Sequence, residues 1–197
     1  ESTVPFAKGG AAAWIFPRVN KCLNWGNKGE EIRRYSSSVM RNESLYFKSG
    51  LTWTNIKSTG RRFGYLPSGV VFDQKGPLLL CEEISDWTLL SVINSSLYHS
   101  LFLSLTPDRT WGQGDVGRIP WIKELEEITE LEGIGKKQYS RLVRNDLYNP
   151  TSPYYAAPGL VPEQYLDGYF FKKSPLLETE TVSEEIGSSY GVQERPI

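Results

Sequence analysis

The stretch from Tyr46 to Leu80 most constrains the fold, because short β-favouring clusters alternate there with turns marked by glycine and proline. The clusters are Leu51-Thr52-Trp53, Phe63-Gly64-Tyr65 and Val70-Val71-Phe72. Strands this short and this closely spaced are typical of a β-meander. The sequence therefore predicts an antiparallel sheet in this part of the chain.

The same stretch is basic. Lys48, Lys57, Arg61 and Arg62 fall within fifteen positions, and Asp73 is the only acid between Leu45 and Leu80. The formal charge of −1 hides an asymmetry: residues 28–62 hold eight cations and three acids, whereas residues 163–197 hold seven acids and three cations. A basic half and an acidic tail indicate a localised anion-binding face.

A long helix is expected after these strands. Ser85 or Asp86 is the expected N-cap, and apolar residues follow at helical spacing as far as Leu105, before Pro107 ends the helix. One apolar stripe needs a sheet to cover it, so we expect residues 87–105 to pack on the meander. The predicted fold class is α+β: an antiparallel β-meander packed against one long helix, followed by a helical and proline-rich C-terminal extension.

Downstream, residues 116–119 are expected to form a strand and residues 122–131 a second amphipathic helix. The segment from Leu131 to Lys137 has two interpretations: a helix-hairpin-helix turn that aims backbone N–H groups at a DNA phosphate, or a polar linker. Prolines between Asn149 and Pro162 indicate an extended loop.

At 197 residues with 39% hydrophobic content, the chain can bury one sizeable core. We expect a domain over residues 1–120 and a helical and extended segment over residues 121–197 that links to further parts of a parent protein. Cys22 and Cys81 lack metal-site spacing and are expected to be reduced. No apolar run approaches the roughly 18 residues that span a bilayer, and the expected location is the cytoplasm.

The candidate DNA-binding residues are cations, which suit phosphates, and turn residues, which suit base edges. They are Lys48, Asn55, Lys57, Ser58, Arg61, Arg62, Arg33 and Arg34. For Arg33 and Arg34, phosphate contact and simple exposure to solvent on a helix surface are equal alternatives. The aromatic residues between the turns, such as Trp53 and Phe63, are expected in the core.

Catalytic motifs are missing from this sequence. Gly9-Gly10 is not followed by a phosphate-loop pattern, so we interpret the pair as a turn or a close backbone approach. Asn149-Pro150-Thr151-Ser152-Pro153-Tyr154 only superficially resembles an Asn-Pro-Pro-Tyr motif, and His99, the single histidine, has no partner pattern. The central region is too poor in acids for a metal-dependent nuclease, and we predict neither a catalytic residue nor a metal site.

Residues across about two-thirds of the chain resemble a known family. Tyr46-Phe47-Lys48, Thr52-Trp53 and Phe72-Asp73 are similar to the target-recognition region of adenine-specific DNA methyltransferases of the BREX phage-defence type (PglX-like) and of fused restriction-methyltransferases. Asn94-Ser95 and Gly114-Asp115 resemble the helix and the strand that follow this region in that family.

The resemblance implies a DNA sequence-recognition domain that binds double-stranded DNA and chooses the target site. The implied partners are the N-terminal methyltransferase domain of the parent protein, which would use S-adenosylmethionine, and other subunits of the defence system. The segment itself carries no cofactor motif, and no membrane partner is expected. The alternative is a protein-interaction module that docks partner subunits or a phage-encoded antagonist; salt dependence separates the two functions, because phosphate contacts weaken steeply with salt.

Overall fold

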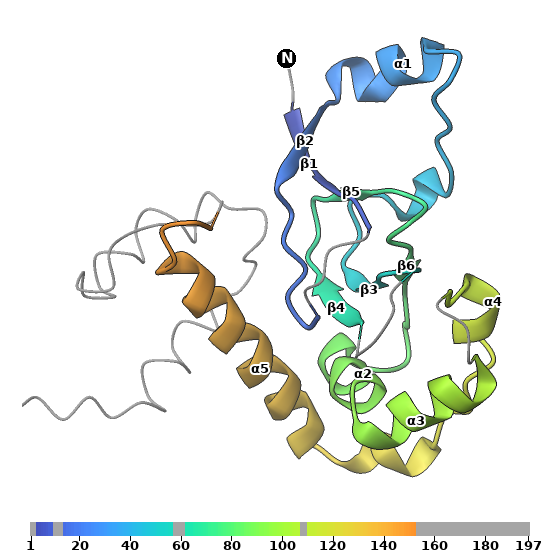
Figure 1. Ribbon diagram of the computed structural model, residues 1–197, viewed down its shortest axis with the longest axis vertical. Coiled ribbons are helices and arrows are strands. Elements are labelled where there is room, and N and C mark those ends of the chain that lie inside the picture. Colours follow the sequence, from blue (N-terminus) through green and yellow to red (C-terminus); the bar gives the residue numbers. More distant parts are fainter. Residues whose placement is uncertain (1–2, 10–13, 57–61, 107–109, 153–197) are drawn as a thin grey trace, which may run out of the picture.

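The computed structural model describes residues 3–9, 14–56, 62–106 and 110–152 of the chain (Figure 1). It is a mixed α+β fold, as predicted. The strands are β1 Thr3–Ala7, β2 Lys21–Asn24, β3 Gly50–Trp53, β4 Phe63–Leu66, β5 Val71–Phe72 and β6 Leu78–Leu79. The helices are α1 Gly26–Arg34, α2 Asp86–Ile93, α3 Ser96–Leu105, α4 Gln113–Val116 and α5 Glu130–Leu147, with short 3-10 helices at Glu43–Leu45 and Lys123–Glu127.

Two three-stranded sheets carry the described strands. One has the order β4-β3-β6 with antiparallel pairing throughout, and β3, as its central strand, is buried along its whole length. The other has the order β2-β1-β5, in which β1 pairs antiparallel with β2 and parallel with β5. The expected meander is therefore antiparallel from β3 to β4 and from β3 to β6, but β5 leaves it to join the N-terminal strand.

The single long helix of the prediction is in fact two helices, α2 and α3, which are bent by 68° at their junction. Asn94 ends α2, and its side-chain Nδ2 donates to the Phe63 carbonyl of β4 at 3.1 Å. Ser95 then begins α3, because its hydroxyl accepts from the Tyr98 backbone N–H at 3.3 Å. An N-cap in the middle of an apolar pattern starts a new helix, which hydrophobic spacing alone does not reveal. The N-cap predicted for α2 is confirmed at Ser85.

Two further expectations about the second half were wrong. Residues 116–119 are not a strand; the Asp115 carboxylate accepts from the Gly112 backbone N–H at 2.8 Å and caps the short helix α4. The expected helix over 122–131 is a 3-10 turn, and the long helix α5 begins only at Glu130. Gly133 and Gly135 lie inside α5, so the hairpin interpretation of this segment is wrong as well.

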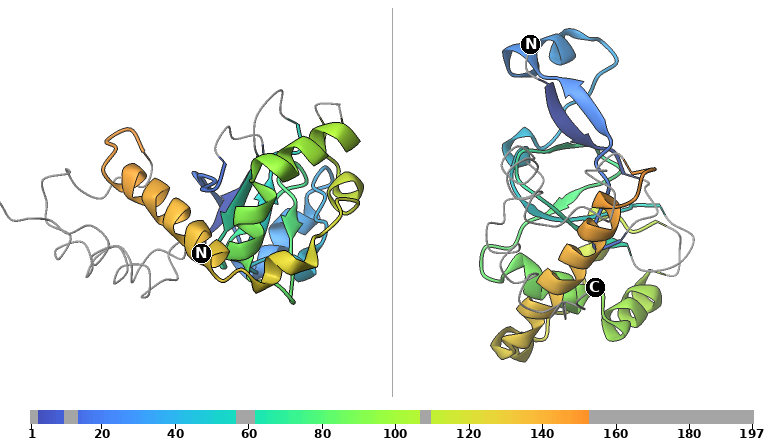
Figure 2. Two further views of the ribbon diagram at one scale, coloured as in Figure 1. Left: turned by 90° about the horizontal axis from the view of Figure 1, so that it is seen from below. Right: turned by 90° about the vertical axis from the view of Figure 1, so that its left-hand side faces the viewer.

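The larger core lies between the β4-β3-β6 sheet and the helices α2, α3 and α5, which Figure 2 shows gathered at one end of the molecule. Phe63, Phe102 and Trp111 are at its centre, with the last two rings stacked at 4.5 Å. Tyr139 and Val143 of α5 belong to the same core, so this helix packs with the preceding segment. The division of the chain at residue 120 stays a prediction.

A smaller core joins the two sheets through Leu66, Val70 and Phe72. Beyond it, the β1–β2 hairpin and α1 form an arm that extends away from α2, α3 and α5 (Figures 1 and 2). Cys22 on this arm is exposed and Cys81 is half-buried, and neither forms a disulfide. Over the described ranges, no single helix is long and apolar enough to cross a membrane; α2 and α3 reach that length and composition only when joined across their bend.

Candidate nucleic-acid interface

Arg33 and Arg34 lie on the exposed surface of α1, and each is paired with a carboxylate. Arg33 forms an ion pair with Glu43, whose hydrogen bond raises the pKa of the Arg33 guanidinium. Arg34 pairs with Glu30 at 2.5 Å, one helical turn earlier. These carboxylates offset both positive charges, so the two arginines offer less attraction to phosphate than their number in the sequence indicates.

The remaining predicted residues, apart from Lys48, lie in the connection between β3 and β4. Lys48 is exposed in the turn before β3, and Asn55 is half-buried just after it. Lys57, Ser58 and Arg61 lie outside the described residues. The structure thus fixes the two ends of the basic turn, at Asn55 and Arg62, and describes nothing between residues 57 and 61.

Arg62, predicted to contact DNA, is only 3% exposed. Its guanidinium lies 3.7 Å from the centre of the Trp111 ring, and Nη1 donates to the Thr54 and Asn55 carbonyls at 3.4 and 3.3 Å. Burial lowers the pKa of Arg62 to about 10, which still leaves the group charged at neutral pH. In this position the side chain holds the start of β4 against the core and is shielded from solvent, and its contact with DNA stays a prediction.

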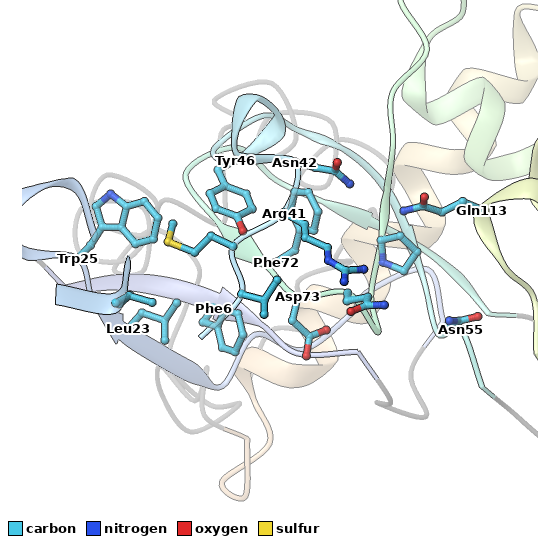
Figure 3. A pocket seen from close by; sticks show the side chains of 15 residues that line it. Phe6, Leu23, Trp25, Arg41, Asn42, Tyr46, Asn55, Phe72, Asp73 and Gln113 are labelled. Atoms are coloured by element: carbon cyan, nitrogen blue, oxygen red, sulfur yellow. The ribbon is translucent and has the colours of Figure 1, made fainter. Parts of the chain in front are cut away.

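A cleft of about 580 Å³ lies between the arm and the two sheets (Figure 3). Apolar and aromatic side chains, among them Leu23, Trp25 and Phe72, line one part of it. The Tyr46 ring makes edge contacts with Trp25 and Phe72 at 5.9 and 5.3 Å, and burial is the main cause that raises the pKa of its hydroxyl. The aromatic part of the cleft is therefore held rigidly.

Polar side chains from four separate segments line the other part of the cleft. They are Arg41, Asn42, Asn55, Asp73, Gln74 and Gln113. Figure 3 shows Asn42, Asn55 and Gln113 at the end of the cleft opposite Leu23 and Trp25. Within the described residues, the side chains of Arg41, Asn42, Gln74 and Gln113 make no hydrogen bond or ion pair, so their donors and acceptors are available to a ligand.

Sequence reasoning missed most of this cleft. Arg41 contributed only to the count of charges, and Asn42, Gln74 and Gln113 were not selected at all. Uncharged amides 71 positions apart, from Asn42 to Gln113, form no local pattern, and only the fold brings them together. Asn55 is the one cleft residue that the sequence did predict. It was a candidate because it lies in the turn between the clusters Leu51-Thr52-Trp53 and Phe63-Gly64-Tyr65.

Gly9 packs directly on protein backbone. A Cβ built on Gly9 would lie 2.0 Å from the Lys75 carbonyl carbon, so there is no space for a side chain at this position. The Gly9 N–H donates to Asp73 Oδ1 at 3.2 Å, consistent with the expected close backbone approach. Asn149 Oδ1 accepts from the Thr151 backbone N–H at 3.0 Å and closes a local turn after α5.

Comparison with known proteins gives two clear similarities, although no protein-family model matches the chain. The chain is 34% identical over 136 residues, 68% of its length, to the adenine-specific methyltransferase BrxX of Escherichia coli O9:H4 (strain HS). It is 28% identical over 138 residues, 64% of its length, to the adenine-specific methyltransferase PglX of Lacticaseibacillus casei (strain Zhang). These matches span only 11% and 12% of the two relatives. Homologues of this chain are therefore adenine-specific methyltransferases, of which it corresponds to a small part.

Proposed function

We propose that this chain is the part of a phage-defence adenine methyltransferase that binds duplex DNA and chooses the target site. The similarity to two adenine-specific methyltransferases carries the proposal. Because the sequence has neither the cofactor loop nor the catalytic tetrapeptide, methyl transfer with S-adenosylmethionine would belong to the N-terminal domain of the parent protein. Other defence-system subunits would be further partners of that parent.

Three exposed lysines support binding to phosphates. Lys8, Lys48 and Lys75 make no ion pair with any described residue. Lys8 and Lys75 lie close together in space, because the adjacent Gly9 packs on the Lys75 backbone, and Lys75 directly follows the cleft residue Gln74. Cations of this kind fix the position of a protein on a duplex without reading its sequence.

Salt dependence of duplex binding by the 197-residue chain tests this proposal. We expect affinity to fall steeply with salt, and Lys48→Ala or Lys75→Ala to lessen the log–log slope by about one unit each. Lys136→Ala is the control, because this lysine lies on α5 and is already paired with Glu132 at 3.0 Å. Binding that is absent, or indifferent to salt in all four proteins, would contradict the proposal.

A second function, docking of another protein, is favoured by helix α3. Its ten residues carry no charge, and Leu97, Leu103 and Leu105 are 55%, 48% and 54% exposed. The Ser100 and Ser104 hydroxyls donate to backbone carbonyls one turn earlier, which leaves this surface less polar still. Partner binding that resists salt and is lost on Leu97→Asp would support this alternative.

A further inference from the structure

Four side-chain amides line the cleft between the arm and the sheets. Asn42 precedes the 3-10 helix Glu43–Leu45, Asn55 follows β3, Gln74 lies in the turn after β5, and Gln113 begins α4. Asn42, Gln74 and Gln113 are exposed at the cleft, whereas Asn55 is half-buried. We call these four residues the amide wall.

The amide wall has unused hydrogen-bonding capacity. Asn55 Oδ1 is fully buried and has no hydrogen-bond partner, although the Asn55 backbone is held at both ends by bonds to Lys75 and Trp111. A buried amide oxygen without a partner is costly, and such groups recur where a ligand completes the bonding. Each of the other three amides keeps both its donor and its acceptor available.

The charge of the cleft indicates what kind of ligand it suits. Among the lining residues that the structure describes, Arg41 and Asp73 are the ionised ones, and their charges balance. Asp73 is also committed to the fold, since its Oδ1 accepts from the backbone N–H groups of Gly9, Lys75 and Gly76. A neutral site rich in amides is poorly suited to phosphate, but it suits an uncharged edge that both donates and accepts.

An adenine in the major groove presents such an edge. Its N6 amino group donates and its N7 accepts, and the side chains of Asn and Gln match this pair with two parallel hydrogen bonds. Arginine prefers guanine in the same way, and among the described lining residues Arg41 alone could supply that contact.

We propose that the amide wall is a specificity-determining surface that reads the adenine edge of an A·T pair in the target. This inference rests on the proposed function and adds to it the residues and the base. Gln113 and Asn42, both exposed, make the first contacts, and Asn55 supports them from deeper in the cleft. The amide wall contributes sequence preference, while the lysines contribute affinity that depends on salt.

Selection of duplexes from a random library by the full 197-residue chain tests the inference. Gln113→Glu and Asn42→Asp keep side-chain shape but remove the NH2 group that must donate to adenine N7. Asn42 has a φ of 55°, and Asp tolerates this left-handed conformation. Gln138→Glu is the control, because it adds the same charge to an exposed amide on α5, outside the cleft.

We expect the unmodified chain and Gln138→Glu to select the same motif with at least one fixed A·T pair. Gln113→Glu and Asn42→Asp should lose about tenfold or more of the preference at one such position, the range of one bidentate contact, with an unchanged salt slope. A motif that survives in both cleft variants would overturn the inference and leave the proposed function intact. Failure of the unmodified chain to select any duplex would overturn both. If the variants and the unmodified chain have equal melting temperatures, the loss of base preference is not due to unfolding.

Discussion

Among single residues, the buried Arg62 shows best how position decides role. Its sequence neighbours made it a candidate for a DNA contact, yet its guanidinium stacks on Trp111 and donates to two backbone carbonyls. Desolvation opposes this burial and lowers the pKa of Arg62. The contacts with Trp111, Thr54 and Asn55 offset that cost, and they fix the residues on either side of the basic turn.

The first prediction compares the buried Arg62 with Lys48, which is proposed to contact phosphate. Arg62→Ala should lower the free energy of unfolding by about 1–3 kcal/mol, because it removes the ring contact and two hydrogen bonds, one of them buried. Lys48→Ala should leave stability within about 0.5 kcal/mol, as exposed substitutions do. Urea denaturation measures both. If Arg62→Ala were as stable as the unmodified chain and lessened the salt slope of DNA binding, Arg62 would be a phosphate contact after all.

The second prediction concerns two glycines of α5 that differ only in their surroundings. A Cβ at Gly135 would lie 2.3 Å from the Trp87 carbonyl oxygen, so Gly135→Ala must push α5 away from α2 and should cost about 1–3 kcal/mol. A Cβ at Gly133 would meet nothing within 4 Å. Gly133→Ala should therefore stabilise the protein by about 0.5–1 kcal/mol, the usual gain in a helix interior. Equal effects of the two substitutions in urea denaturation would contradict the close packing of these helices.

Among the elements, the junction of α2 and α3 determines how the larger core closes. α2 packs on the β4-β3-β6 sheet and on α5, whereas α3 turns by 68° and brings Phe102 onto Trp111. Asn94 ties the end of α2 to β4, and Ser95 starts the next helix. A continuous helix over residues 86–105 would not make both sets of contacts.

The third prediction tests the cap that starts α3. Ser95→Ala should lower stability by about 1 kcal/mol, because the Tyr98 backbone N–H loses its side-chain acceptor. Ser100→Ala, five positions later on the exposed surface of the same helix, removes a hydroxyl that only bonds back to the Ser96 carbonyl. It should be neutral or slightly stabilising, since Ala is the better helix former. Thermal unfolding of the two variants side by side decides the matter; a stable Ser95→Ala protein would show that the bend needs no cap.

How far the sequence predicts these elements depends on whether the signal is local. β-favouring clusters placed β3, β4 and β5 close to their observed positions, and Ser85 marked the start of α2. The parallel pairing of β1 with β5 could not be foreseen, because it joins Phe6 to Val71 across 65 positions. Gly135 was interpreted as part of a turn. The structure instead requires glycine there because the backbone of α2 at Trp87 lies too close for a side chain.

In the candidate site, too, the sequence predicts what has a local signal and misses what depends on contacts between distant residues. Charge patterning found Lys48, and turn composition found Asn55, the most buried member of the amide wall. Counting charges could not reveal that Arg33 and Arg34 are paired with Glu43 and Glu30. The amide wall itself required the fold, since its members come from four segments and carry no charge.

On the scale of the whole molecule, the cleft lies between the arm and the sheets, and the exposed Lys75 directly follows its lining residue Gln74. Under the proposed function, this arrangement separates two tasks, attraction of a polyanion and discrimination among its sequences. The chain covers 11% and 12% of the two methyltransferases that it resembles. Under the proposed function, this small segment directs where a much larger enzyme methylates DNA.

Exchange of this segment between two enzymes tests whether it chooses the methylated sequence. A chimera would carry residues 3–152 in place of the matching segment of the Escherichia coli relative, and sequencing of methylated adenines in genomic DNA would identify its target. We predict that the methylated sequence changes from that of the Escherichia coli enzyme, and that Gln113→Glu in the chimera relaxes it at one A·T position. A chimera that methylates DNA at the unaltered sequence of the Escherichia coli enzyme would contradict the account.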